Sequence, residues 1–224
     1  MDERARAAAL NNAVWCDAVW RSHGLTAIHE ARFWATADRA PVFYPDAVTL
    51  EPTATARELL AQIDDSPGCS IKDSFAVLDL HGSGYNVLFD AEWYLREPGP
   101  SGPTTGAWTI VETPADLAEW ARAHGGGDVF RPGLLGDPTI RILVRSLPNG
   151  GIAGAIASRG GGVVGVSNVF GGETADVGLD GLVDAIQALF PGETIVGYGA
   201  GEDLSGAIAA GFLPIGPLRV WMRS

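Results

Sequence analysis

Positive charge is scarce in this chain. Its 224 residues include 15 Lys and Arg against 27 Asp and Glu, so the formal net charge is −12, and Lys72 is the only lysine. Nucleic-acid binding requires a cationic face toward the phosphates, so we expect no nucleic-acid partner. The surplus of carboxylates suits a cationic small-molecule substrate, although solubility alone explains it as well.

Cysteine and long apolar runs are also scarce. Cys16 and Cys69 are the only cysteines, too few for a disulfide framework and typical of reduced thiols in a cytosolic protein. No stretch reaches the roughly 20 apolar residues of a membrane-spanning helix. The first residues lack the apolar core of a signal peptide. We therefore expect a cytoplasmic protein without a membrane partner.

Signatures of several common chemistries are missing. The four histidines are dispersed without zinc-like spacing and no cysteines are paired, so no metal site is expected. The sequence has no Gly-x-Ser-x-Gly nucleophile elbow and no Gly-Lys-Ser/Thr phosphate loop. The many glycines are therefore interpreted as hairpin and loop residues.

Apolar residues make up 46% of the chain, enough for a sizeable core. In the first hundred residues, periodicity and turn residues predict helices over 4–22 and 55–63, strands over 27–35 and 42–50, and a hairpin of strands 74–80 and 85–95. Residues 97–106 are rich in Pro, Gly, Ser and Thr and are the best candidate for a linker.

The rest of the chain begins with a predicted strand over 108–111 and a helix that Thr113 caps and Pro114 opens. Three β-rich runs separated by turn residues then predict an antiparallel meander over 141–145, 152–158 and 163–170. After the meander we predict a helix over 179–189, a strand over 194–198, a helix over 203–210 and a strand over 218–223.

This order, with its ending on Gly211-Phe212 and a returning strand, resembles the GNAT (Gcn5-related N-acetyltransferase) acyltransferases. The resemblance implies an α+β fold with a mixed, mainly antiparallel sheet and flanking helices. It covers a GNAT-like domain over residues 104–224. Residues 1–100 lie outside it, as an N-terminal α/β extension or a partial, degenerate second GNAT-like copy.

In GNAT enzymes the fourth and fifth strands splay apart and acyl-CoA lies in the gap. By resemblance these strands are 163–170 and 194–198, and the cofactor is acetyl-CoA or another acyl-CoA. Main-chain amides around Ser167, Asn168 and Val169 would then polarise the thioester carbonyl. Asn168 is equally well explained as a residue that turns the strand.

GNAT enzymes also hold the CoA diphosphate in a loop at a helix N-terminus. The motif of this loop is Arg or Gln, any two residues, Gly, any one residue, then Gly or Ala. The resemblance places this cofactor-binding loop around Gly171, Gly172 and Gly178. If Gly178 is its first glycine, Ala175 stands where Arg or Gln belongs and Asp180 where Gly or Ala belongs.

The surrounding charges disfavour a phosphate ligand. From Gly160 to Leu218 the chain has no Lys, Arg or His. The same stretch carries seven carboxylates, namely Glu173, Asp176, Asp180, Asp184, Glu193, Glu202 and Asp203. Each like-charge contact at partial burial costs on the order of 1 kcal/mol. Only Arg159 and Arg219 flank this stretch.

The family's general acid, a Tyr four residues before the Gly-Phe pair, is replaced here by Ala207. Tyr198 is the nearest substitute, against the simpler reading of a packing residue at a strand end. A general base is missing from the fourth strand, so Glu173 or Glu112 would act through a water. The predicted catalytic residues are thus Tyr198, Glu173 and Asn168.

The expected function is transfer of an acyl group from acyl-CoA to an amine of a small molecule. The alternative is a GNAT-fold protein without CoA-dependent activity, serving as a binding or assembly module or using the cleft for another reaction. Homodimer formation is left open.

Overall fold

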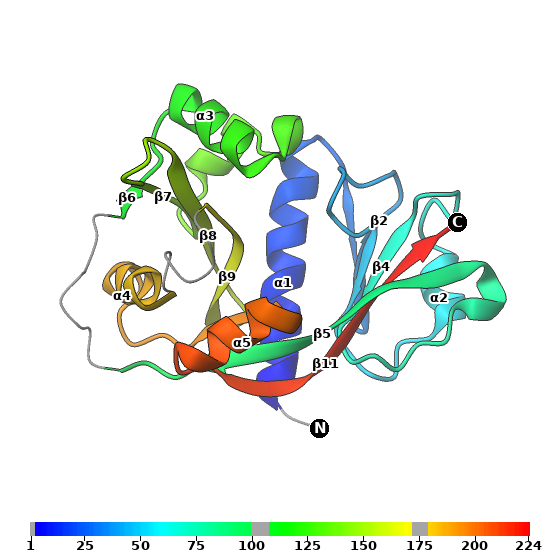
Figure 1. The fold of residues 1–224 in the computed structure, drawn as a ribbon. Coiled ribbons are helices and arrows are strands. Elements are labelled where there is room, and N and C mark those ends of the chain that lie inside the picture. Colours follow the sequence, from blue (N-terminus) through cyan, green and yellow to red (C-terminus); the bar gives the residue numbers. More distant parts are fainter. Residues whose placement is uncertain (1–2, 100–107, 172–178) are drawn as a thin grey trace.

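A computed structural model describes residues 3–99, 108–171 and 179–224. Within these residues, eleven strands form one sheet with helices on its faces (Figure 1). The predicted α+β fold with a mixed, mainly antiparallel sheet is confirmed. None of the helices in the described ranges combines the length and the apolar character needed to cross a membrane.

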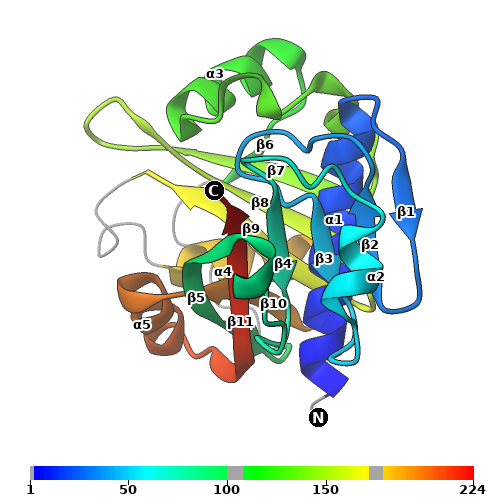
Figure 2. The ribbon, with the colours of Figure 1, turned by 90° about the vertical axis from the view of Figure 1, so that its right-hand side faces the viewer.

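The first part of the chain contributes three helical segments and five strands. They are α1 (Glu3–Ser22), β1 (Ala27–His29), β2 (Phe33–Thr36), β3 (Ala47–Thr49), α2 (Ala56–Leu60), β4 (Ser70–Asp73), the 3-10 turn η1 (His81–Ser83) and β5 (Tyr85–Arg96). In Figure 2, α2 lies over the end of the sheet that β2, β3 and β4 form.

The second part contributes the remaining six strands. The elements are β6 (Thr109–Ile110), α3 (Pro114–His124), η2 (Gly127–Val129), η3 (Pro132–Gly136), β7 (Ile140–Ser146), β8 (Ile152–Gly160), β9 (Val163–Phe170), α4 (Leu179–Leu189), β10 (Ile195–Gly199), α5 (Gly201–Ala209) and β11 (Leu213–Arg223). The predicted meander is confirmed, because β7, β8 and β9 pair antiparallel in that order.

The predicted hairpin of strands 74–80 and 85–95 is wrong. Residues 74–80 form no strand, because β4 ends at Asp73 and the chain turns there. The Asp73 carboxylate accepts hydrogen bonds from the N–H groups of Phe75 (3.3 Å) and Leu78 (2.7 Å). The second predicted strand is β5, but its partners are β10 and β11. The predicted strand 27–35 is likewise divided, into the antiparallel pair β1 and β2.

The two ends of the sheet repeat one pattern of pairing. The strand order is β1-β2-β3-β4-β11-β5-β10-β9-β8-β7-β6. At one end of the sheet, β1, β2 and β3 pair antiparallel, and β4 then pairs parallel to β3. At the other end, β7, β8 and β9 pair antiparallel, and β10 then pairs parallel to β9. The central strands are exchanged, since β5 pairs with β10 and β11 pairs with β4. The sheet therefore runs through both predicted parts of the chain.

Helix α1 lies between the two ends of the sheet (Figure 1). Small residues let it approach closely: Ala8, Ala9 and Ala13 are fully buried. Neighbouring residues of β8 point to opposite faces, so Ile156 packs in the cluster of α1 and α3, whereas Ala155 packs with α4 and α5. Helices α4 and α5 thus cover the face opposite α1.

Candidate functional site

The parallel strands β9 and β10 separate after a short paired region. Their ladder consists of Ile195 opposite Val164 and Val196 opposite Gly165. Strand β9 continues to Phe170 and β10 to Gly199 beyond the last pair. The predicted separation of these strands is confirmed, and it leaves the far part of β9 without β10 as a partner.

A β-bulge lies in the part of β9 that pairs with β8 but no longer with β10. Ile156 of β8 is opposite Ser167 but Gly154 is opposite Phe170, so β9 carries one extra residue there. Asn168 takes a left-handed conformation with φ +53°, which Asn tolerates better than most residues. Bulges re-aim side chains and occur beside active sites. The bulge and the left-handed conformation of Asn168 therefore support the interpretation that this residue turns the strand.

Side chains around the bulge are held by local contacts. The Asn168 amide nitrogen donates to Ser167 Oγ at 3.0 Å, and its amide oxygen accepts from the Tyr44 hydroxyl at 3.5 Å. Val169 is exposed. The Asn168 side chain is therefore held by these two contacts, and its main-chain N–H is a candidate donor toward a ligand.

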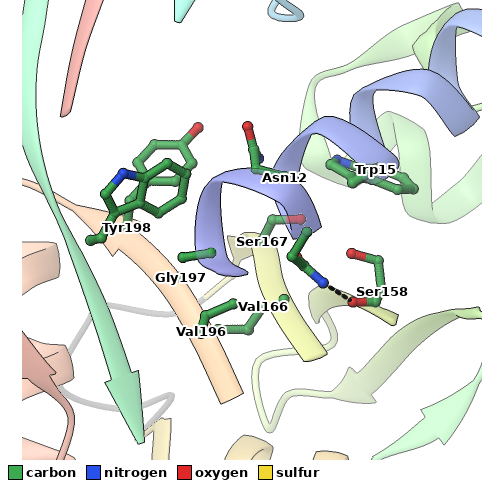
Figure 3. Close-up of a pocket in the computed structure, with 12 residues that line it drawn as sticks. Asn12, Trp15, Ser158, Val166, Ser167, Val196, Gly197 and Tyr198 are labelled. Carbon is green, nitrogen blue, oxygen red and sulfur yellow. Dashed lines mark hydrogen bonds between the residues drawn. The ribbon is translucent and has the colours of Figure 1, made fainter. Parts of the chain in front are cut away.

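On the α1 side, the opening between the strands is nearly filled by the chain itself. Residues of α1, β5, β8, β9 and β10 surround a cavity of about 10 Å³, room for about one water. Figure 3 shows Asn12 and Trp15 of α1 above this opening, with Ser167 and Tyr198 from the two separated strands.

Asn11 accounts for much of this filling. Its amide nitrogen donates to the carbonyl oxygens of Ser158 (2.8 Å), Gly160 (3.1 Å) and Val163 (3.2 Å); the first of these bonds is the dashed line in Figure 3. A Cβ atom on Gly165 would lie 2.0 Å from the Asn11 amide oxygen. Gly165 therefore leaves the space into which Asn11 fits.

Above the opening lies a buried polar cluster built from three elements. Lys72 of β4 is 4% exposed, and its ammonium donates to Asn12 Oδ1 of α1 and to the Tyr198 hydroxyl of β10, each at 3.0 Å. Its Nζ also lies 4.1 Å from the centre of the Tyr198 ring. No carboxylate of the described residues lies within 4.0 Å of Lys72 Nζ.

Two further ionisable groups lie beside this cluster. The Cys16 sulfur is 3.8 Å from Asn12 Oδ1, and burial raises the pKa of its thiol to about 11. Burial also raises the pKa of Tyr44 well above its ordinary value. Both groups are uncharged at neutral pH, so Cys16 is not poised as a thiolate nucleophile.

The two arginines that flank the cation-free stretch have acidic partners. Arg159 pairs with Glu193 at 2.8 Å and Arg219 with Asp90 at 2.6 Å. Neither guanidinium is therefore free to hold a phosphate without giving up an ion pair. Among the described residues, these two flanking arginines therefore do not provide an unpaired cation for this stretch.

Several predicted site residues have a defined place, and three do not. Glu173, Gly172 and Gly178 lie outside the described residues. Gly171 has φ +88°, and a Cβ on it would lie 2.4 Å from the Ile152 carbonyl oxygen. Backbone packing against β8 is therefore enough to require glycine at 171, and its predicted cofactor contact stays a prediction. Glu112 is exposed on the connection between β6 and α3.

Lys72, Asn11 and Asn12 were missed by the reasoning from sequence. A signal was present for each. Lys72 is the only lysine and stands between Ile71 and Asp73 in a short β-rich run, and the two asparagines interrupt an alanine-rich helix. Polar groups in such apolar surroundings need partners. Lys72 and Asn12 bond each other across 60 residues of sequence, and Asn11 bonds main-chain carbonyl oxygens of β8 and β9.

Solved structures with this arrangement of elements cover nearly the whole chain. A GCN5-related N-acetyltransferase from Kribbella flavida matches with a TM-score of 0.63 and 14% identity, over 96% of this chain and 95% of its own. A putative acetyltransferase of the GNAT family from Novosphingobium aromaticivorans matches with a TM-score of 0.59 and 12% identity, over 96% and 98%. The chain has the GNAT fold.

A functionally unknown conserved protein from Staphylococcus epidermidis also matches, with a TM-score of 0.56 and 10% identity over 89% of this chain and 94% of its own. No family model matches the sequence, and no curated protein matches it either. At these identities the likeness establishes the GNAT fold, with β9 and β10 as its splayed strands, and leaves the ligand to be argued from the site.

Proposed function

We propose that the protein transfers an acyl group from acetyl-CoA or another acyl-CoA to the amine of a small molecule. One observation carries the proposal: β9 and β10 stop pairing after Gly165 and Val196, and Tyr198 lies two residues beyond that point on β10. An unpaired strand edge offers N–H donors to a thioester carbonyl. A phenol hydroxyl beside it offers a proton to the departing sulfur.

The roles divide among residues of the two strands. Main-chain N–H groups around Ser167, Asn168 and Val169 are proposed to polarise the carbonyl. When the carbon–sulfur bond breaks, the electron pair goes to sulfur, and the Tyr198 hydroxyl supplies the proton. Glu173 is proposed as the base that takes a proton from the amine, and Gly171, Gly172 and Gly178 as the loop toward the diphosphate.

The residues fit the two ends of acyl-CoA unequally. The free edge of β9 suits the thioester end. The diphosphate end finds no cation between Gly160 and Leu218, and Arg159 and Arg219 are already paired. We therefore expect recognition to depend on the thioester arm, with the phosphates contributing little.

This unequal fit predicts how ligands and salt affect binding. Acetyl-CoA and acetyl-pantetheine should bind with dissociation constants within about tenfold of each other, and raising the salt from about 0.05 to 0.5 M should change both little, because few charges are paired on binding. Isothermal calorimetry measures both. Binding of acetyl-CoA that is more than about a hundredfold tighter and strongly salt-dependent would contradict this view of the site.

Activity is tested by acetyl transfer to a panel of small amines, with Tyr198→Phe as the variant. Loss of a general acid typically costs a factor of about 10² to 10⁴ in rate, while binding of acetyl-CoA should be retained. Tyr94→Phe is the matched control, because Tyr94 is buried against Phe212 on the other side of the sheet. Equal rates for Tyr198→Phe and wild type would remove Tyr198 from the mechanism.

A cationic substrate is proposed from the net charge of −12. The buried ammonium of Lys72 lies beside the Tyr198 hydroxyl, so a second positive charge at that point is repelled. The acceptor amine is therefore expected to enter the reaction as the neutral free base. Acidic side chains elsewhere would attract the cation before it loses its proton.

The filled opening favours a second candidate function. The cavity that Asn12, Ser167 and Tyr198 line measures about 10 Å³, so a substrate fits into it only if the lining side chains move. A GNAT-fold module that has lost CoA-dependent activity, or that uses the cleft for another reaction, would look like this. Absence of calorimetric heat and of a melting-temperature shift with acetyl-CoA and with acetyl-pantetheine would select this candidate. Sedimentation analysis would then test assembly into a homodimer.

A further inference from the structure

We propose that Lys72 is a positioning residue for Tyr198: it fixes the direction of the Tyr198 hydroxyl and supplies the counter-charge for the phenolate that forms when this hydroxyl gives up its proton. The inference rests on the proposed acyl transfer for its catalytic meaning. Lys72 lies outside residues 104–224 and is held in β4, so the first part of the chain would help to build the site of the second.

The direction of the hydrogen bond is set by chemistry. A lysine ammonium can only donate, so in its 3.0 Å contact the Tyr198 oxygen is the acceptor. The hydroxyl proton of Tyr198 must then point away from Lys72. It is left available for a group in the opening between β9 and β10, where Tyr198 lines the cavity.

Lys72 is itself held firmly. Its backbone lies inside the sheet, opposite Val48 on one side and Val220 on the other. Its ammonium also donates to Asn12 Oδ1, and Asn12 is 8% exposed. The Trp93 ring packs edge-on against the Tyr198 ring, with the ring centres 5.4 Å apart. The oxygen of Tyr198 is thus presented to one fixed donor.

The charge balance gives the contact its proposed chemical role. A buried ammonium without a carboxylate beside it is costly, and the described residues place none within 4.0 Å of Lys72. When Tyr198 loses its proton, the phenolate and the ammonium form an ion pair at a distance already set. A neutral side chain at position 72 with the same shape would lack this effect.

The competing explanation is that Lys72 only joins α1, β4 and β10. A double-mutant cycle separates the two roles, using Lys72→Met, Tyr198→Phe and the double variant. If Lys72 acts through the Tyr198 hydroxyl, Lys72→Met should lower kcat by roughly tenfold or more with KM for the acyl donor within about twofold. In the Tyr198→Phe background the same substitution should change kcat by less than about twofold.

Losses that simply multiply in the double variant would overturn the proposal. Lys72→Arg keeps the charge and should recover part of kcat, whereas Lys72→Gln keeps a donor without the charge and should not. These two variants also keep the test decisive if Lys72→Met folds poorly. Equal activity of Lys72→Arg and Lys72→Gln would contradict the proposed counter-charge.

A second measurement does not depend on activity. The chain has four tyrosines, so protein labelled with carbon-13 at tyrosine Cζ gives few signals, and Tyr198→Phe identifies that of Tyr198. Lys72→Gln should move this signal and leave that of Tyr85, which bonds Asp65, unchanged. An unmoved Tyr198 signal overturns the inference. A moved signal in a protein that neither binds nor uses acyl-CoA would refute the proposed function while the Lys72–Tyr198 contact stands.

Discussion

At the scale of the residue, a few buried amides and one ammonium decide how closely α1 approaches the splayed strands. Asn11 and Asn12 sit next to each other in the sequence and serve different partners. Asn11 bonds the main chain of β8 and β9, and Asn12 bonds Lys72. Both side chains are buried, so their amide groups must form their hydrogen bonds within the protein. An apolar residue at either position would leave a buried partner without its hydrogen bond.

Asn11→Ala should destabilise the protein by about 1–3 kcal/mol, because it removes the donor that three carbonyl oxygens share. Urea unfolding followed by circular dichroism measures the change. Asn86→Ala is the matched control, since Asn86 is exposed and, among the described residues, its side chain bonds only the Ser224 hydroxyl. A change below about 0.5 kcal/mol for Asn11→Ala would show that these contacts contribute little.

At the scale of the element, the five-residue helix α2 is stabilised by reciprocal hydrogen bonds between the two residues that flank its first turn. Thr55 and Glu58 form a capping box, with Glu58 N–H donating to the Thr55 hydroxyl and Thr55 N–H donating to the Glu58 carboxylate. The Arg32 guanidinium next to β2 also donates to Glu58, at 2.7 Å. Such a short helix depends on these contacts rather than on its own length.

The capping box predicts a pH dependence. Hydrogen bonds from Arg32 hold the pKa of Glu58 at about 2, well below its ordinary value of 4.5. A lowered folded-state pKa gives stability that is present above 4.5 and is lost as the pH falls toward 2. Glu58→Gln should therefore lower the melting temperature slightly at neutral pH and match wild type near pH 2, as an exposed pair contributes little. Glu119→Gln, on the exposed face of α3, should show no such difference.

At the scale of the whole molecule, the exchange of β5 and β11 ties the two ends of the sheet together. Strand β5 follows β4 in the chain but lies between β11 and β10. Strand β11 follows β10 in the chain but pairs with β4 and β5. The repeated pairing pattern is what the proposed partial second copy in residues 1–100 would produce. The division at residues 1–100 and 104–224 is therefore a proposal about origin, and it does not separate two complete sheets.

Fragments 1–100 and 104–224 should each fail to fold alone, because each lacks the central strand that the other supplies. Thermal melting followed by circular dichroism should show no cooperative transition for either fragment. Co-expression should restore one, since the strands can then pair between chains. A cooperative melt of the isolated 104–224 fragment would show that the second part does not need β5.

The sequence by itself predicted local features of the chain, such as the ends of a helix and the turns between strands. Helix α3 begins where Thr113 caps it and Pro114 opens it, and ends at Gly125. The meander of β7, β8 and β9 follows from turn residues between apolar runs. Tyr198 could also be placed beside the opening, because it ends the strand that the resemblance identified. Each of these signals spans only a few residues, so neighbouring side chains and backbone conformation determine them.

Tertiary structure alone decided the partners of β5 and the surroundings of Tyr198. Strand β5 pairs with a strand more than a hundred residues later, and its own apolar pattern suits a near or a distant partner equally. Lys72 of β4 reaches Tyr198 of β10 across β11 and β5, which lie between these two strands in the sheet. Pairing over such separations depends on the whole packed sheet and on α1, which no short stretch of sequence contains.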